Sequence, residues 1–105
     1  MWARLVPDGT RMPSGDKRIV YIIRSDREPA RHYVGVTRNV RDRLDWHNHG
    51  PSGHTTSYRP WSVVVSIEFP SERAALRFEK YLKSGSGRAF AKRHFSASTA
   101  DGGSD

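Results

Sequence analysis

The sequence predicts a small α/β domain, in which a three-stranded antiparallel sheet is flanked by helices in the order β-β-α-β-α-α. Short runs rich in β-branched residues occur at residues 18–24, 32–37 and 61–69, and polar or turn-forming residues bound each run. Segments with helical spacing follow the second and third runs. A length of 105 residues is that of one domain, and 35% hydrophobic residues allow one small core.

The first two strands are expected to form a hairpin. Residues 18–24 read RIVYIIR, an apolar run with a charge at each end. A polar turn that contains Pro29 follows, and residues 32–37 (HYVGVT) form the second strand. Gly35 interrupts this strand. An isolated glycine inside a strand often marks a bulge or a place where another group comes close to the backbone.

A helix is predicted after the hairpin, and the strongest strand follows it. Asn39 is a good N-cap for a helix over residues 40–48, which Gly50 ends. The side chains expected to face inward are Val40, Leu44, Trp46 and His47. A polar loop over residues 52–59 leads to residues 61–69 (WSVVVSIEF), which read as a buried strand.

Two further helices complete the predicted domain. Ser71 follows a proline that breaks the third strand, and it caps a helix over residues 72–83. A Gly-Ser-Gly segment ends that helix. Residues 88–95 then form a short basic helix, and Ser86 is expected to open it as a cap.

Charge and composition divide the chain into three parts. We expect a flexible tail over residues 1–16, a folded domain over residues 17–95 and a disordered tail over residues 96–105. Both tails contain Gly- and Ser-rich segments that cannot bury enough surface to offset the entropy of ordering. The folded part carries 16 Lys and Arg against 7 Asp and Glu, a net charge of +9, compared with +7 for the whole chain.

The basic charge predicts a polyanionic partner, with nucleic acid as the first choice and an anionic membrane surface as the second. The chain has no cysteine, which excludes disulfides, thiol catalysis and cysteine-based zinc sites. No apolar run approaches the ~18 residues of a membrane span, and no signal-peptide core follows Met1. We therefore expect a cytoplasmic protein that associates with the nucleoid when it binds DNA.

One acidic residue is unusual in its position. Ala75, Phe78, Glu79 and Leu82 share one face of the predicted helix, so Glu79 lies within or beside the apolar stripe. A carboxylate in such a place needs a cation, a metal ion or a raised pKa. The alternative is a surface ion pair between Glu79 and Lys83, which are four residues apart.

Four other residues have two interpretations each. Arg43 and His47 are four residues apart and project from one helix face, where they suit a phosphate group or form part of a solvated face. Tyr21 and Tyr33 each lie in the middle of a hairpin strand. They form a cross-strand aromatic pair, or their phenols point into a site.

Two clusters of residues could each form a binding site or have no binding role. His47, His49 and His54 suggest a zinc site, but no cysteine is present and no acidic residue lies between Asp45 and Glu68, so we do not predict one. The basic residues near the C-terminus fit a strip that contacts phosphates, or a solvated helix face. They are Lys80, Lys83, Arg88, Lys92 and Arg93.

Taken together, these residues resemble the GIY-YIG endonuclease superfamily. The tripeptide VYI at residues 20–22 stands where the first family tripeptide belongs, and YVG at residues 33–35 stands where the second belongs. Arg43, His47 and Glu79 follow in the family order. The resemblance covers almost the whole folded part, and it is greatest to small stand-alone members that look like the N-terminal nuclease domain of the excinuclease of excision repair.

The resemblance implies hydrolysis of DNA phosphodiester bonds with one divalent ion, Mg²⁺ or Mn²⁺. Glu79 would bind the metal ion, and Arg43 would stabilise the negative charge of the transition state. Tyr21 would act as the base, with its pKa lowered by the metal ion and Arg43. Tyr33 and His47 would orient the attacking water and the phosphate.

The resemblance also assigns substrate-binding residues. Gly35 would let the DNA backbone come close. The residues expected to bind flanking phosphates are Lys83, Arg88, Lys92 and Arg93. Many family members carry an asparagine after the glutamate helix, whereas here Ser84 and Ser86 stand in that region.

Three functions follow from these observations, and they belong to different classes. The first is a structure-selective DNA endonuclease of repair or recombination, with which a protein partner is compatible. The second is a nucleic-acid-binding domain whose nuclease site is degenerate. The third is a basic module that binds an acidic protein or membrane surface, and the absence of a strongly amphipathic basic helix places it last.

Overall fold

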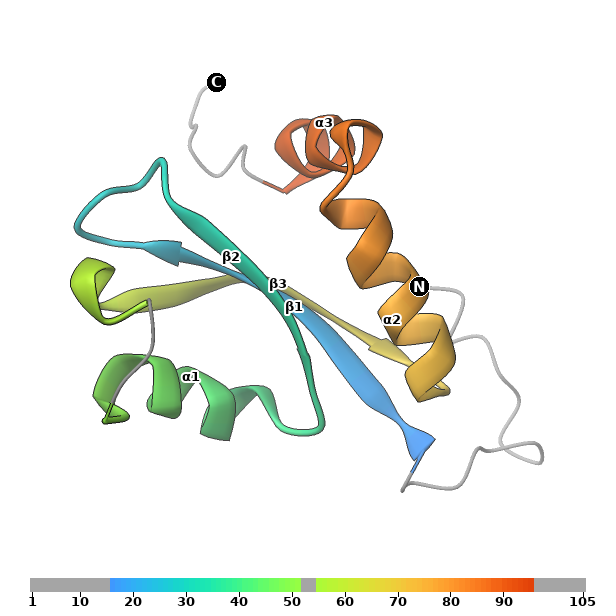
Figure 1. Cartoon of the computed structure of the whole chain (residues 1–105), viewed down its shortest axis with the longest axis horizontal. Helices are drawn as coiled ribbons and strands as arrows, with labels where there is room; N and C mark the ends of the chain where they lie inside the picture. Colours follow the sequence, from blue (N-terminus) through green and yellow to red (C-terminus); the bar gives the residue numbers. More distant parts are fainter. Residues whose placement is uncertain (1–15, 52–54, 96–105) are drawn as a thin grey trace.

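The computed structural model describes residues 16–51 and 55–95 of the chain. The elements are β1 (Arg18–Ser25), β2 (His32–Thr37), α1 (Val40–His49), the 3-10 turn η4 (Thr56–Tyr58), β3 (Trp61–Phe69), α2 (Glu72–Leu82) and α3 (Gly85–His94). The predicted fold class and the order β-β-α-β-α-α are confirmed (Figure 1). The two predicted tails lie outside the described residues, except for Asp16.

The sheet has the strand order β2-β1-β3, and both pairings are antiparallel. The first strand in the sequence is therefore the central strand. Tyr21 pairs with Gly35 of β2, and this register fixes which side chain covers the glycine. On the other side the register shifts between Ile22 and Ile23, which marks a bulge in the pairing with β3.

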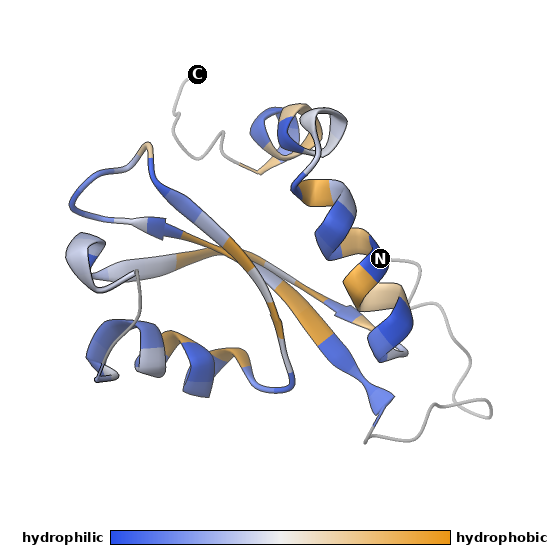
Figure 2. Cartoon of the chain, in the orientation of Figure 1, coloured by the Kyte–Doolittle hydropathy of each residue, from blue (hydrophilic) through white to orange (hydrophobic). Residues whose placement is uncertain are grey.

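Alternating side chains of β1 point to opposite faces of the sheet, and each face has its own core. Val20 and Ile22 belong to a cluster with Ala75 and Leu82 of α2. Tyr21 and Ile23 lie on the other face, in a cluster that includes residues of α1. Helix α1 therefore covers one face, and α2 and α3 lie on the other (Figure 1). Figure 2 shows the apolar residues gathered where the strands cross and along α2.

The helices begin at residues whose side chains satisfy free backbone N–H groups. Asn39 accepts a hydrogen bond from the amide of Asp42, and Ser71 accepts one from Ala74, as predicted. The third cap differs from the prediction. Ser84, rather than Ser86, caps α3, and its Oγ lies 3.1 Å from the amide nitrogen of Gly87.

The early start of α3 has a steric cause. Helix α2 ends at Leu82 and α3 begins at Gly85, so only two residues separate the helices and they join at a sharp corner. A Cβ atom on Gly87 would collide with the backbone carbonyl of Tyr81. Gly87 thus permits the tight junction and does not end α2.

The helices in residues 16–51 and 55–95 were compared with the requirements of a membrane span. No helix there combines the length and the apolar character that are needed to cross a bilayer.

Candidate active site

Tyr21 lies at the centre of the candidate site, and Gly35 makes room for its ring. The Tyr21 side chain is completely buried on the α1 face of the sheet. A Cβ atom at position 35 would lie 2.5 Å from Oη of Tyr21 and less than 3 Å from two ring carbons. The group that approaches Gly35 is therefore a phenol of the same chain, whereas the resemblance implies a DNA backbone.

His47 is held at both ring nitrogens inside the protein. Its Nε2 lies 2.9 Å from Oη of Tyr21, and its Nδ1 lies 3.2 Å from Oγ1 of Thr55. A neutral imidazole donates through one nitrogen and accepts through the other, so both contacts are satisfied when Tyr21 donates to Nε2 and Nδ1 donates to Thr55. The His47 residue is 2% exposed, and the predicted solvated helix face does not include it.

Tyr33 completes an aromatic cluster with these two residues. Its ring centroid lies 4.9 Å from that of His47 in an edge-on arrangement, and 6.4 Å from that of Tyr21. Tyr33 is half-buried, whereas Tyr21 and His47 are buried. Of the two tyrosines, only Tyr33 can present its phenol to a bound molecule.

Arg43 and Glu79 act on the same phenol from α1 and α2. The pKa of Tyr21 is raised to about 12, chiefly because burial disfavours the charged phenolate, and the neighbouring Tyr33 acts in the same direction. The charge of Arg43 and a hydrogen bond from it lower this pKa, and the charge of Glu79 raises it. The net shift is opposite to the lowered pKa that the resemblance implies, because desolvation outweighs Arg43. The structure thus brings Tyr21, Tyr33 and His47 into contact, and it places Arg43 and Glu79 close enough for their charges to act on the Tyr21 phenol.

Glu79 takes part in both of the arrangements that its spacing allows. Nζ of Lys83 donates to its Oε2 at 2.8 Å, which is the predicted i,i+4 ion pair. The Glu79 side chain is only 20% exposed, and its charge reaches Tyr21 on the other face of the sheet. Glu79 therefore forms the ion pair with Lys83 and at the same time influences the aromatic cluster.

The carboxylate of Glu79 is chemically suited to a divalent metal ion. No group of three or more potential ligands (His, Cys, Asp or Glu) occurs among the described residues. Mg²⁺ commonly uses one or two protein carboxylates and keeps several waters, so one glutamate is sufficient. Glu79 supplies the hard oxygen ligand that such an ion prefers.

Of the three histidines that were considered for a zinc site, the two that the structure describes have different surroundings. His47 is occupied by Tyr21 and Thr55, and His49 lies 3.0 Å from a carboxylate oxygen of Asp45. His54 lies outside the described residues.

The C-terminal end of α1 is fixed by residues that sequence patterns did not single out. Nε and a terminal nitrogen of Arg59 donate to the backbone carbonyls of His47 and Gly50, both at 2.6 Å. Asn48 exchanges two hydrogen bonds with the backbone of Trp61. These contacts hold the helix turn that carries His47. In the sequence, Arg59 and Asn48 are marked only by their polar side chains near the ends of predicted elements.

The position of Trp46 differs from the prediction, which placed this side chain on the inward face of α1. Val40 and Leu44 are half-buried against the sheet, but Trp46 is 44% exposed. The helical phase that buries His47 turns its neighbour outward. Trp46 and Arg43 both line an open hollow of about 540 Å³.

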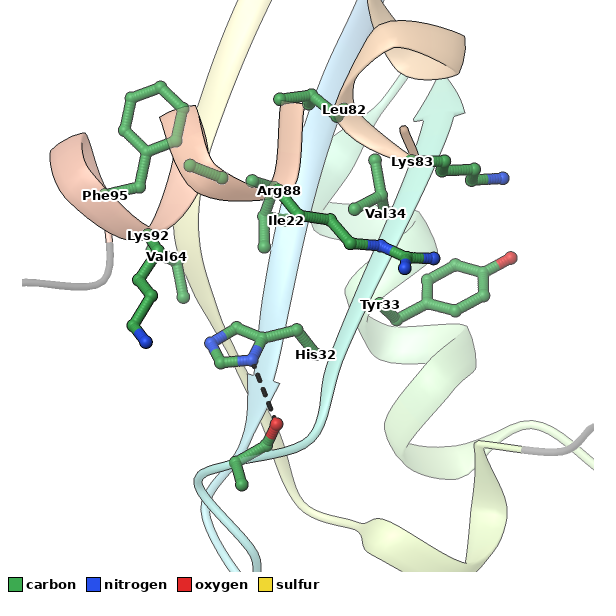
Figure 3. A pocket seen from close by; sticks show the side chains of 12 residues that line it. Ile22, His32, Tyr33, Val34, Val64, Leu82, Lys83, Arg88, Lys92 and Phe95 are labelled. Atoms are coloured by element: carbon green, nitrogen blue, oxygen red, sulfur yellow. Dashed lines mark hydrogen bonds between the residues drawn. The ribbon is translucent and has the colours of Figure 1, made fainter. Parts of the chain in front are cut away.

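Three of the four predicted phosphate-binding residues line a larger cavity. Lys83, Arg88 and Lys92 surround a volume of about 740 Å³ between α3 and the sheet (Figure 3). Tyr33 also lines it, so the cavity adjoins the aromatic cluster. Arg93 is exposed and is not among the described residues that form its wall.

The most informative relatives are subunits of one kind of nuclease. The chain is 42% identical over 66 residues to the structure-specific endonuclease subunit SLX1 of Chaetomium globosum, and 39% identical over 82 residues to that of Candida dubliniensis. These matches cover 57% and 71% of this chain, but only 20% and 27% of the two relatives. The chain thus spans about a fifth to a quarter of their length.

A family model matches almost the whole described domain. It is the GIY-YIG catalytic domain, and it matches residues 17–94. The matched range includes β1, which carries Tyr21, and α2, which carries Glu79. The predicted superfamily is confirmed, and this chain belongs to the GIY-YIG catalytic domain family.

Proposed function

We propose that this chain cuts phosphodiester bonds in branched DNA, with one Mg²⁺ or Mn²⁺ ion bound at Glu79. The observation that carries the proposal is the contact cluster of Tyr21, Tyr33 and His47, which lies near Arg43 and Glu79 and within the GIY-YIG match over residues 17–94. A cation and a carboxylate beside an aromatic hydroxyl cluster supply the charges that hydrolysis of a phosphodiester requires.

Each of the two charged residues has one role in this proposal. Arg43 donates to a non-bridging oxygen of the scissile phosphate and stabilises the charge that develops there. Glu79 would hold the metal ion, which would supply Lewis-acid polarisation of the phosphate. Lys83 already contacts Glu79, so it lies where it can also contact a neighbouring phosphate.

The tyrosines exchange roles relative to the mechanism that the resemblance implies. Tyr21 is buried, its pKa is about 12, and its phenol contacts His47, so it is poorly suited to remove a proton from water. We propose that the half-buried Tyr33 contacts the attacking water. Tyr21 and His47 then position the ring of Tyr33.

The wider setting is also a proposal. The relatives are named structure-specific endonuclease subunits, which supports branched DNA as the substrate and a protein partner for this chain. Their names say nothing about the place of this chain in a cell, and cytoplasmic localisation stays a prediction.

The test is a nicking assay with Mg²⁺ on branched, damaged and plain duplex DNA. We expect Glu79→Gln and Arg43→Ala each to lower the rate about 10²-fold or more, because each removes one charge from the reaction centre. Arg41→Ala on α1 and Glu72→Gln on α2 are the matched controls, and we expect them to retain activity. EDTA should abolish nicking and leave DNA binding intact.

A non-cleaving DNA-binding domain is the second candidate. The ion pair of Lys83 with Glu79 favours it, because the ammonium occupies one oxygen of the only proposed metal ligand. Salt-sensitive DNA binding without nicking in either metal would establish this candidate. Activity that persists unchanged in both Glu79→Gln and Arg43→Ala would instead sink the site assignment.

A further inference from the structure

The cavity between α3 and the sheet combines an apolar floor with a cationic rim. The floor is formed by Ile22, Val34, Val64 and Leu82, which come from all three strands and the end of α2. Lys83, Arg88 and Lys92 belong to the rim, and no Asp or Glu occurs among the described residues that line the cavity. Such a wall fits a flat apolar group that carries negative charge at its edge.

The cavity is continuous with the candidate active site through two residues. Tyr33 belongs to the aromatic cluster with His47 and also lines the cavity. Lys83 donates to Glu79 and lines the cavity as well. Figure 3 shows the Arg88 side chain extending across the cavity toward Tyr33. A molecule in the cavity therefore lies beside the position proposed for the scissile phosphate.

We propose that this cavity binds one unpaired nucleotide of a branched DNA, with the base on the apolar floor and its phosphates at Lys83, Arg88 and Lys92. The proposal rests on the proposed function of the chain as a DNA endonuclease. A volume of about 740 Å³ is within the range of ligand sites, and it admits a nucleotide.

Only an unpaired base can reach this floor. A base within a duplex is stacked and paired, and it enters a protein cavity only after it leaves the stack. A single-stranded extension at a branch has already lost those contacts. The cavity thus gives the chain a physical way to prefer a branch over plain duplex, in addition to its contacts with phosphates.

The first test measures DNA binding in EDTA, so that no strand is cut. The probes are fluorescent flap DNAs in which one of the first three unpaired nucleotides lacks its base. We expect one of these abasic probes to bind about tenfold more weakly than the complete flap, as the loss of one base contact predicts. Equal Kd values for all probes would overturn the proposal. This result is also expected if the true occupant of the cavity is a side chain of a partner protein.

The second test fills the cavity. Ala91 lines it, whereas Ala89 of the same helix is exposed and is not part of its described wall. We expect Ala91→Leu to weaken binding of the complete flap about tenfold and to remove the difference from the abasic probe. Ala89→Leu should bind like the wild type. If the two variants behave alike, the proposal is wrong.

Three further variants keep the test decisive. Ala30→Leu adds the same bulk from the exposed hairpin loop, so it tests the cavity even if Ala91→Leu fails to fold. Lys92→Gln should weaken flap binding more than duplex binding, and Arg93→Gln should weaken both equally. Equal effects of these two charge changes on the flap-to-duplex ratio would contradict the cationic rim.

The same DNAs separate this proposal from the proposed function. Nicking of the complete flap with Mg²⁺, together with binding that ignores the missing base, would overturn only the nucleotide site. Base-dependent binding without nicking would support the nucleotide site and would overturn only the catalytic proposal.

Discussion

Gly35 determines where the Tyr21 phenol lies. Adding one methyl group at this position therefore tests the packing around the phenol. A Cβ atom at position 35 would meet the hydroxyl and two carbons of the ring, which is part of the buried cluster with His47. We expect Gly35→Ala to destabilise the protein by about 1–3 kcal/mol through overpacking, and to impair nicking. Urea unfolding and the nicking assay measure the two effects.

Gly85 provides the matched control for that substitution. No atom lies within 4 Å of a Cβ built at Gly85, which is the first residue of α3. Alanine should therefore be tolerated there, with no loss of stability. An equal loss in both variants would show that space around Tyr21 is not the cause.

The buried phenol of Tyr21 predicts a pH effect on stability. Burial raises its pKa to about 12 in the folded protein, compared with about 10 when the chain is unfolded. The folded state therefore holds this proton more tightly. The contribution to stability is complete below pH ~10 and is lost as the pH rises toward about 12.

Tyr21→Phe isolates this contribution because phenylalanine does not titrate. Between pH 8 and pH 11 we expect the free energy of unfolding of the wild type to fall by about 1 kcal/mol more than that of the variant. Urea unfolding at several pH values measures the difference. Parallel curves for the two proteins would contradict the raised pKa.

Some residue-level properties cannot be predicted from this sequence. The spacing of Arg43 and His47 indicates one helix face, but it does not say that His47 is buried while Arg43 is exposed. Thr55 and Arg59 contact His47 across a loop, and no periodic pattern marks such contacts. The pKa of Tyr21 depends on burial, which only the assembled sheet and helix produce.

At the level of elements, the N-cap of α3 gives a prediction that stability measurements can test. The Ser84 side chain accepts from the amide of Gly87 and donates to the carbonyl of Tyr81 at 2.6 Å. We expect Ser84→Ala to cost about 1 kcal/mol, the usual cost of losing an N-cap. Ser86→Ala is the control, since Ser86 is exposed, and it should change stability by less than about 0.5 kcal/mol. The reverse order in thermal unfolding would contradict this cap.

Most of the elements could be predicted because their signals are local. The β-branched runs, the caps at Asn39 and Ser71, and the helical spacing agree with the strands and helices that form. The start of α3 could not be predicted in this way. It depends on how closely Gly87 approaches the backbone of Tyr81, and this is a contact between two helices.

For the molecule as a whole, the charge predicts a strong salt effect. Residues 17–95 carry a net charge of +9. If the interface involves about four phosphates, affinity for DNA should fall roughly 10²-fold between about 50 and 200 mM salt. Fluorescence anisotropy across this range measures the slope. A flat salt dependence would exclude the basic surface as the main DNA contact.

The whole-molecule arrangement explains why composition alone indicated only an anionic partner. Net charge reports long-range attraction and not the position of any group. Arg43 and Glu79 both influence the Tyr21 phenol although α1 and α2 cover opposite faces of one sheet, and the cavity requires α3 to turn at Gly87. The order of motifs indicated the family, whereas these arrangements arise from the fold.

The central position of β1 has a consequence for the dynamics of the site. Its backbone is paired on both edges and covered on both faces, so its amide hydrogens should exchange with solvent only when the whole domain unfolds. Arg43 and Glu79 lie on outer helices, which can open locally while the sheet persists. The Tyr21 ring would then keep its place during such openings, and the helices would return to the same reference point.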